Sequence, residues 1–253
     1  NYMKWKQTLF WSFSAAAIFY YFLLFGVFVF VGQEEMQLFI PEWWYIREFL
    51  FQPGGFCAVA GQWIIQYYRQ PMSAVVFHTV LLVGCGFMVY RILRCFSDKT
   101  YLLFLSLLPV LYLVKMSIHG EYLVDGTVGV VLMLLALSVS LKVRRAGSIA
   151  GYGIASTLFL CGLTGFLSVC YAFLYTLLAL LRYKTSRQRL AASACLIPAL
   201  FIYLFSGWLG IPVPLSDGWM PEAYLEIQRL PHYYMYRVWT FFTLSIVGVA
   251  LFA

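Results

Sequence analysis

The chain has 253 residues, of which 63% are hydrophobic and 11% are charged, and its mean hydropathy is +0.83. Soluble domains carry about 25% charged residues, so this composition excludes a soluble globular fold and predicts an all-α, polytopic helical membrane protein. The net charge of +7 does not indicate nucleic-acid binding, because the basic residues are spread over short loops between apolar segments. We expect membrane lipids, and no nucleic acid, to be partners of these loops.

Long apolar segments separated by short polar breaks predict about eight transmembrane helices. The expected spans are about 9–31, 72–96, 101–116, 128–141, two within 148–181, 190–209, and one from near Val238. The two spans within 148–181 would turn near Gly162–Gly165, and a single tilted or broken helix is the alternative. We expect 1–253 to be a single transmembrane module of a longer chain, because Ala253 lies inside an apolar run.

Residues 32–71 and 210–237 form the two long polar loops, and the first of them predicts two interfacial helices, near 41–51 and 56–70. Tryptophans near the start of the first helix are typical of a membrane interface, and Gln52–Gly55 breaks the chain between the two. The second helix has an apolar stripe that we expect to face one side: Phe56, Val59, Ala60, Trp63, Ile64, Tyr67 and Tyr68.

The ionisable residues sort by side of the membrane. With the amino terminus inside, 12 of the 17 Lys and Arg residues lie on one side, together with Asp98 as the sole acid. The other nine acids lie on the opposite side. Because basic loops mark the cytoplasm, this pattern predicts a bacterial inner-membrane protein with a cytoplasmic amino terminus and any chemistry at the extracytoplasmic face.

Two acidic groups on that face are the candidate catalytic residues. Glu34 and Glu35 directly follow the first span, and His119, Glu121 and Asp125 share the turn between the third and fourth spans. Glu121 and Asp125 are four residues apart and would share a helix face. Carboxylates act as general bases or bind divalent cations, so a divalent metal held by Glu121 and Asp125 is the candidate cofactor. The alternative is that these charges only end spans and solvate a turn.

Basic side chains on the same face are the candidate substrate contacts. Arg47, Arg229 and Arg237 could each bind a phosphate through the planar guanidinium fork. His119 and His232 complete this group, and His232 opens an aromatic run before the last span. The alternatives are arginines paired with nearby acids and an aromatic belt with no further role. His78, inside the second span, is expected to be buried and hydrogen-bonded.

This layout resembles the membrane module of the C-type glycosyltransferase (GT-C) superfamily. The likeness is carried by Glu34 and Glu35 after the first span, by the long first outside loop, and by Glu121 and Asp125 in the second. It implies sugar transfer from a polyprenyl-phosphate carrier at the outer face, with a first-loop acid as base or metal ligand and the second-loop acids assisting. That superfamily usually has Asp where this chain has Glu34 and Glu35.

Two other functions stay open. Gln52–Gly55, with its aromatic surroundings, also resembles an uncharacterised family of Bacteroidota inner-membrane proteins, which implies no activity. The chain has no nucleotide-binding or hydrolase motif, which fits a non-enzymatic subunit or scaffold of a larger envelope complex, with other membrane subunits as partners. A transporter for a lipid or small anion is the third alternative, although ion-coupled transporters usually carry charges in mid-span.

Overall fold

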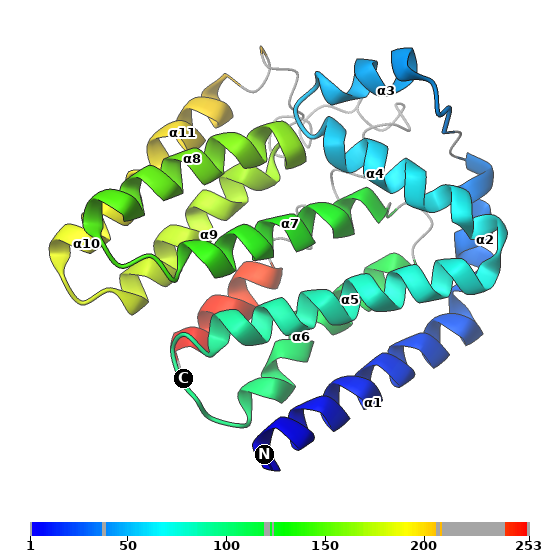
Figure 1. Ribbon diagram of the computed structural model, residues 1–253, viewed down its shortest axis with the longest axis horizontal. Helices are drawn as coiled ribbons and strands as arrows, with labels where there is room; N and C mark the ends of the chain where they lie inside the picture. The colour runs from blue at the N-terminus through cyan, green and yellow to red at the C-terminus, as the bar shows by residue number, and fades with distance from the viewer. Residues whose placement is uncertain are drawn as a thin grey trace, which may run out of the picture.

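The computed structural model describes residues 2–36, 39–118, 122, 124–205, 208 and 241–251, and within these ranges helices are the regular elements (Figure 1). The helices are α1 Tyr2–Phe25, α2 Val27–Met36, α3 Trp43–Leu50, α4 Gly55–Ile65, the 3-10 turn η1 Gln66–Arg69, α5 Pro71–Leu93, α6 Leu102–Ser117, α7 Val124–Ser140, α8 Ala146–Thr164, α9 Leu167–Arg182, α10 Ser186–Ser193 and α11 Leu196–Leu204. A last helix covers Phe241–Leu251. The all-α prediction is therefore confirmed.

Three of these helices are long and apolar enough to cross a membrane: Trp5–Phe25 within α1, α5, and α8. They indicate a membrane protein. The helices α6, α7 and α9 are apolar but have only 16, 17 and 16 residues. At 1.5 Å per residue each is about 24–26 Å long, shorter than the roughly 30 Å of a hydrocarbon core.

The helices form a bundle with two chemically different ends. The loops from α5 to α6, α7 to α8 and α9 to α10 lie on the left of Figure 1, whereas α2, α3 and α4 lie on the right. These loops and the helix ends beside them carry most of the basic residues, so we call this side the basic end. We call the other side, which carries Glu34, Glu48 and Asp125, the acidic end. In the centre, α5 packs against α1, α6 and α7, and α7 also packs against α4, α8 and α9.

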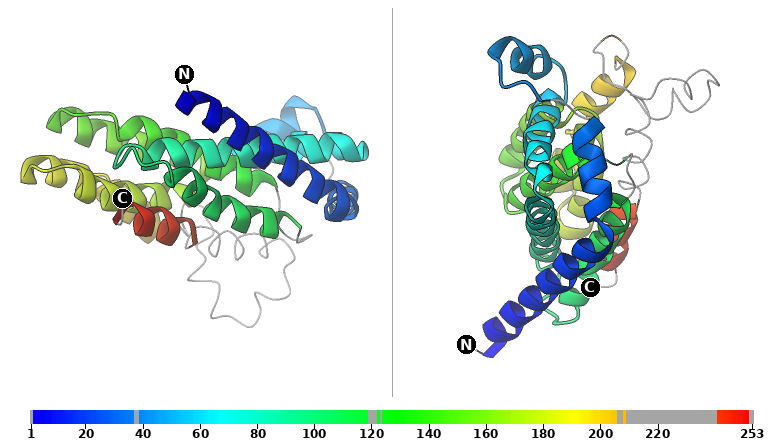
Figure 2. Two further views of the ribbon diagram at one scale, coloured as in Figure 1. Left: turned by 90° about the horizontal axis from the view of Figure 1, so that it is seen from below. Right: turned by 90° about the vertical axis from the view of Figure 1, so that its right-hand side faces the viewer.

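The first predicted span is not a single helix. Helix α1 ends at Phe25, and α2 runs in a new direction after Gly26, as the right-hand view of Figure 2 shows. A side chain at position 26 would contact the rings of Phe22 and Phe30 at 3.0 and 2.8 Å, so the bend depends on glycine. Because of the bend, Glu34 and Glu35 lie on a second helix and not in a loop.

The first long loop contains the two predicted helices, as α3 and as α4 with η1. Helix α3 buries none of its residues, with Trp43 69% and Trp44 60% exposed, as expected of an interfacial helix. In α4 and η1, the predicted stripe is divided: Phe56, Trp63 and Tyr67 are exposed, as an interfacial helix allows, whereas Ile64 and Tyr68 are buried. The face that packs against the bundle consists of Gly55, Cys57, Gly61, Ile64, Ile65 and Tyr68. Small residues on this face allow α4 to approach α7 closely.

Residues 148–181 form a helical hairpin, as predicted, with its turn at Gly165. This turn packs against the turn that precedes α4, because the Gly54 N–H donates to the Gly162 carbonyl oxygen at 3.1 Å. Gly54 and Gly165 have φ values of 84° and 62°, which favour glycine. The carbonyl oxygen of Pro53 would lie 3.4 Å from a Cβ atom at position 165. The two turns therefore fix the first loop on the α8–α9 hairpin.

The predicted span 190–209 is divided into α10 and α11 around Ala194 and Cys195. Proline at 198 has no N–H, and its ring collides with a helical carbonyl four residues earlier, which here belongs to Ala194. That carbonyl instead accepts a bond from the Ile197 N–H at 3.2 Å. The proline thus explains why one apolar segment yields two helices. The predicted loop 210–237 lies outside the described residues.

Candidate functional site

The inner face of α2 connects the first loop to the start of α7. Gln33 is fully buried, and its amide nitrogen donates to the carbonyl oxygen of Tyr122 at 2.8 Å. The hydroxyl of Tyr122 then pairs with the Thr127 hydroxyl at 3.1 Å. This path of hydrogen bonds joins residues 89 positions apart in the sequence and brings the two predicted acidic groups to the same end of the bundle.

Asp125 lies in the first turn of α7, outside the three candidate spans, and is partly buried. Its carboxylate accepts the backbone N–H of Gly126 at 2.6 Å, and its backbone and Cβ pack against Gly61 of α4. Burial raises the pKa of Asp125 to about 6, and the hydrogen bond from Gly126 opposes this shift. Asp125 therefore exchanges a proton near neutral pH, which is what a general acid or base requires.

Glu34 directly follows Gln33 on α2 and is half-buried. Since Gln33 is bonded to Tyr122, three residues before Asp125, the segments that carry Glu34 and Asp125 adjoin at the acidic end. The backbone of Glu35 lies in α2, but its side chain is outside the described residues. Of the four predicted catalytic acids, the structure thus describes the side chains of two and places their segments together.

The structure describes one of the five predicted binding residues, Arg47. Arg47 is exposed on α3, with its guanidinium 5.6 Å from the centroid of the Phe51 ring. Outside the described residues lie His119, Glu121, Arg229, His232 and Arg237. Among the described residues, no group of three or more His, Cys, Asp or Glu side chains could hold a metal ion. Glu121 is not one of the described residues, so the predicted metal pair stays a prediction.

Next to this site lies a buried polar pair that the sequence did not reveal. His78 is fully buried, as predicted, and its Nε2 lies 2.7 Å from the hydroxyl of Tyr68. The ring of Phe30, one turn before Gln33 on α2, stacks on the imidazole at 4.3 Å. The other imidazole nitrogen, Nδ1, has no hydrogen-bond partner in the described part of the chain. The polar interior of this end therefore extends from Thr127 through α2 to η1.

A family profile matches the chain over residues 1–253. The chain belongs to the family of unknown function DUF6057. Neither the curated proteins nor the solved structures contain a match to it. The DUF6057 match covers the whole bundle, including both acidic segments and the α4 helix above them, but it assigns no activity to them.

For this DUF6057 chain, sequence reasoning found the acids but missed the buried hydrogen bonds of Gln33, Tyr122 and Tyr68. The one signal for Gln33 was a neutral polar residue between an apolar segment and two acids, which also fits an ordinary helix end. Tyr122 and Tyr68 had no signal, since aromatic residues are common throughout this chain. The predicted site thus lacked the buried hydrogen bonds that connect its two halves.

Proposed function

We propose that this chain is a GT-C-type, glycosyltransferase-like membrane protein that uses a polyprenyl-phosphate-linked sugar at the extracytoplasmic face. One observation carries the proposal: Asp125, with a pKa of about 6, lies on a segment bonded through Tyr122 to Gln33, the neighbour of Glu34. A carboxylate whose pKa is close to the working pH is suited to accept a proton from a sugar hydroxyl. A second carboxylate, that of Glu34 on the adjoining segment, can act on the same substrate.

The proposal includes a topology of about eight crossings in a bacterial inner membrane, with the amino terminus in the cytoplasm. Its support is the separation of basic and acidic residues between the two ends of the bundle (Figure 1). Helices such as α6 and α9, about 24 Å long, would cross where the bilayer thins locally around them. The acidic end would then face away from the cytoplasm.

We assign the following roles as part of this proposal. Glu34 or Glu35 takes the proton of the acceptor, and Asp125 with Glu121 and His119 positions the reacting group or a divalent metal ion. The lipid-linked phosphate is held by Arg47, Arg229 or Arg237, with His232 beside the sugar. The exposed tryptophans of α3 support sideways entry of a lipid donor near this end.

Substitution of the acids tests the function. The purified protein in nanodiscs is given a panel of polyprenyl-phosphate-linked sugars, and release of polyprenyl phosphate is measured. Turnover is expected to fall by about 10²-fold or more in Asp125→Asn and in one of Glu34→Gln and Glu35→Gln. Glu48→Gln, on the exposed helix α3, is the matched control and should keep full turnover. Unchanged turnover in all the site variants rejects the proposal.

A second candidate is a non-enzymatic subunit of an envelope complex. It is favoured by the packing of Asp125, whose carboxylate accepts the Gly126 N–H and whose backbone supports α4. These contacts give Asp125 a structural role that requires no catalytic function. In that case the protein copurifies with other membrane proteins, releases no polyprenyl phosphate, and keeps those partners in the Asp125→Asn variant.

A further inference from the structure

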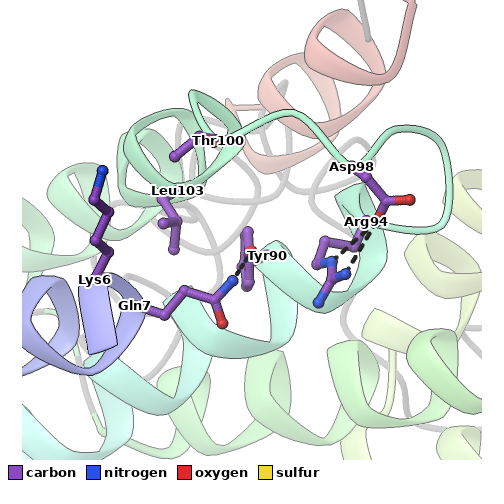
Figure 3. A pocket seen from close by; sticks show the side chains of 7 residues that line it. All are labelled: Lys6, Gln7, Tyr90, Arg94, Asp98, Thr100 and Leu103. Carbon is purple, nitrogen blue, oxygen red and sulfur yellow. Dashed lines mark hydrogen bonds and ion pairs between the residues drawn. The ribbon is translucent and has the colours of Figure 1, made fainter. Parts of the chain in front are cut away.

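A polar pocket lies at the basic end, away from the proposed catalytic acids. It is lined by Lys6, Gln7, Tyr90, Arg94, Asp98, Thr100 and Leu103, and has a volume of about 150 Å³. Figure 3 shows Lys6 and Arg94 on opposite sides of it, with Gln7 and Tyr90 between them. The lining comes from the start of α1, the end of α5, the α5–α6 loop and the start of α6. Two segments far apart in the sequence, residues 6–7 and 90–103, thus build one pocket.

Hydrogen bonds fix the floor of the pocket and one of its walls. The amide nitrogen of Gln7 donates to the Tyr90 hydroxyl at 2.8 Å, which joins α1 to α5. Nε and one terminal nitrogen of Arg94 donate to the same Asp98 oxygen, at 3.3 and 3.0 Å. The side chains of Arg94 and Asp98 are 43% and 82% exposed, so water screens this ion pair and it is weak. A stronger anion can therefore compete with Asp98 for Arg94.

The surroundings of the pocket favour an anion attached to a lipid. Two cations and one acid line it. Arg91 and Lys99 add positive charge nearby, each placed over an aromatic ring at 5.9 and 5.6 Å. Apolar side chains on the adjoining faces of α1 and α6 are strongly exposed, with Trp5 69% and Phe104 67%. Such a boundary between apolar surface and basic loops matches the headgroup level of a bilayer.

We infer that this pocket binds the phosphate of an anionic membrane phospholipid between α1 and the α5–α6 loop. Arg94 binds the phosphate oxygens through its planar fork, Lys6 adds a second positive charge, and Thr100 supplies a hydroxyl donor. The acyl chains extend along the exposed apolar faces of α1 and α6. The bound lipid thereby joins the amino-terminal helix to the bundle at the basic end. This inference does not depend on the proposed enzymatic function.

Lipid retention by the purified full-length chain tests the inference. Native mass spectrometry compares retention of phosphatidylglycerol and phosphatidylcholine from mixed micelles. The wild type should retain phosphatidylglycerol preferentially, and the double variant Lys6→Gln/Arg94→Gln should lose affinity for it roughly tenfold or more. Asp98→Asn should raise the affinity severalfold, because it removes the competing acid and leaves both cations. This last variant keeps the test decisive if the double variant fails to fold.

Two controls determine whether the pocket is specific and where the phosphate comes from. Lys142→Gln/Arg144→Gln removes the same charge from the exposed α7–α8 loop and should leave retention unchanged. Inorganic phosphate at millimolar concentration should not displace the lipid; displacement would assign the pocket to a free phosphate instead and overturn the lipid assignment. Equal retention of both lipids, or equal loss in the α7–α8 control, would overturn the inference entirely.

Discussion

Gly61 of α4 lies directly against Asp125 of α7: a Cβ atom at position 61 would be 2.7 Å from the Asp125 Cβ and 2.9 Å from its backbone nitrogen. Real Cβ atoms do not approach other atoms so closely, so the two helices can meet here only because residue 61 has no side chain. The position of the carboxylate at the acidic end is thereby fixed by a glycine on another helix.

Gly61→Ala is therefore expected to separate α4 from α7. The added methyl group meets backbone atoms that cannot rotate away, and such overpacking costs about 1–3 kcal/mol. We expect a lower Tm in detergent and faster proteolysis of the first loop. Gly151→Ala on α8 is the matched control, since a Cβ atom there has nothing within 4 Å. Equal stability of the two variants would show that α4 does not pack on Asp125.

The stability of the protein should depend on pH through Asp125. Its pKa rises from an ordinary value of 3.8 to about 6 in the folded state, so the folded chain binds more protons than the unfolded chain between these values. The contribution of Asp125 to the free energy of unfolding is consequently highest below about pH 4 and is lost as pH rises through about 6. Asp125→Asn should be more stable than the wild type at pH 7.5, by at most about 2 kcal/mol because the group is partly exposed.

Thermal unfolding of the two proteins across this pH range checks the prediction. The difference between wild type and Asp125→Asn should disappear on going from pH 7.5 to pH 4. A difference that stays constant with pH would mean that the carboxylate has no raised pKa.

Gln33→Leu should destabilise the acidic end. The substitution removes the amide that donates to the Tyr122 carbonyl, and an unpaired carbonyl in the interior costs about 1–3 kcal/mol. Gln66→Leu is the control, because the Gln66 side chain is exposed and its bond to the Phe39 carbonyl is 3.3 Å long. Denaturant unfolding in detergent should show a clear loss for Gln33→Leu and a change of about 0.5 kcal/mol or less for the control. Similar losses in both would contradict a buried role for Gln33.

The contact between the two glycine turns gives a further prediction. Gly165→Ala places a side chain at φ 62° and ψ −123°, a sparsely populated backbone conformation that costs about 1–3 kcal/mol, and brings its Cβ against the Pro53 carbonyl. Gly162→Ala, three residues earlier in the helical part, meets nothing within 4 Å and should be neutral or slightly stabilising. Limited proteolysis near residues 52–55 should accelerate in the first variant alone. If both variants behave alike, the turns do not hold the first loop in place.

Local patterns were sufficient to predict the all-α class, the separation of charge and the α8–α9 turn, because each depends on short stretches of sequence. The face of α4 that packs on α7 was not predicted, for a physical reason. Apolar periodicity selects the largest side chains, and Phe56 and Trp63 are exposed here. The contact with α7 is made through small residues such as Gly61, which let two helices approach closely.

In the candidate site too, features of single segments could be predicted, whereas contacts between distant segments could not. Its acids could be named from charge and position, since both are properties of single segments. The bond between Gln33 and Tyr122 joins residues 89 positions apart and depends on the bend at Gly26. The sequence near Gly26 does not predict that bend, because Phe22 and Phe30, whose rings leave no room for a side chain at position 26, are ordinary residues of an apolar helix.

In the proposed topology the acidic and basic ends face opposite sides of a membrane, with the acidic end outside. Labelling of single cysteines tests it most directly, in a variant that lacks the six native cysteines. Glu48→Cys on α3 and Lys184→Cys between α9 and α10 place one exposed thiol at each end. In intact cells a membrane-impermeant maleimide should label Glu48→Cys at once, and Lys184→Cys only after the membrane is permeabilised. Equal labelling of both positions in intact cells, or the reverse order, would contradict the claim.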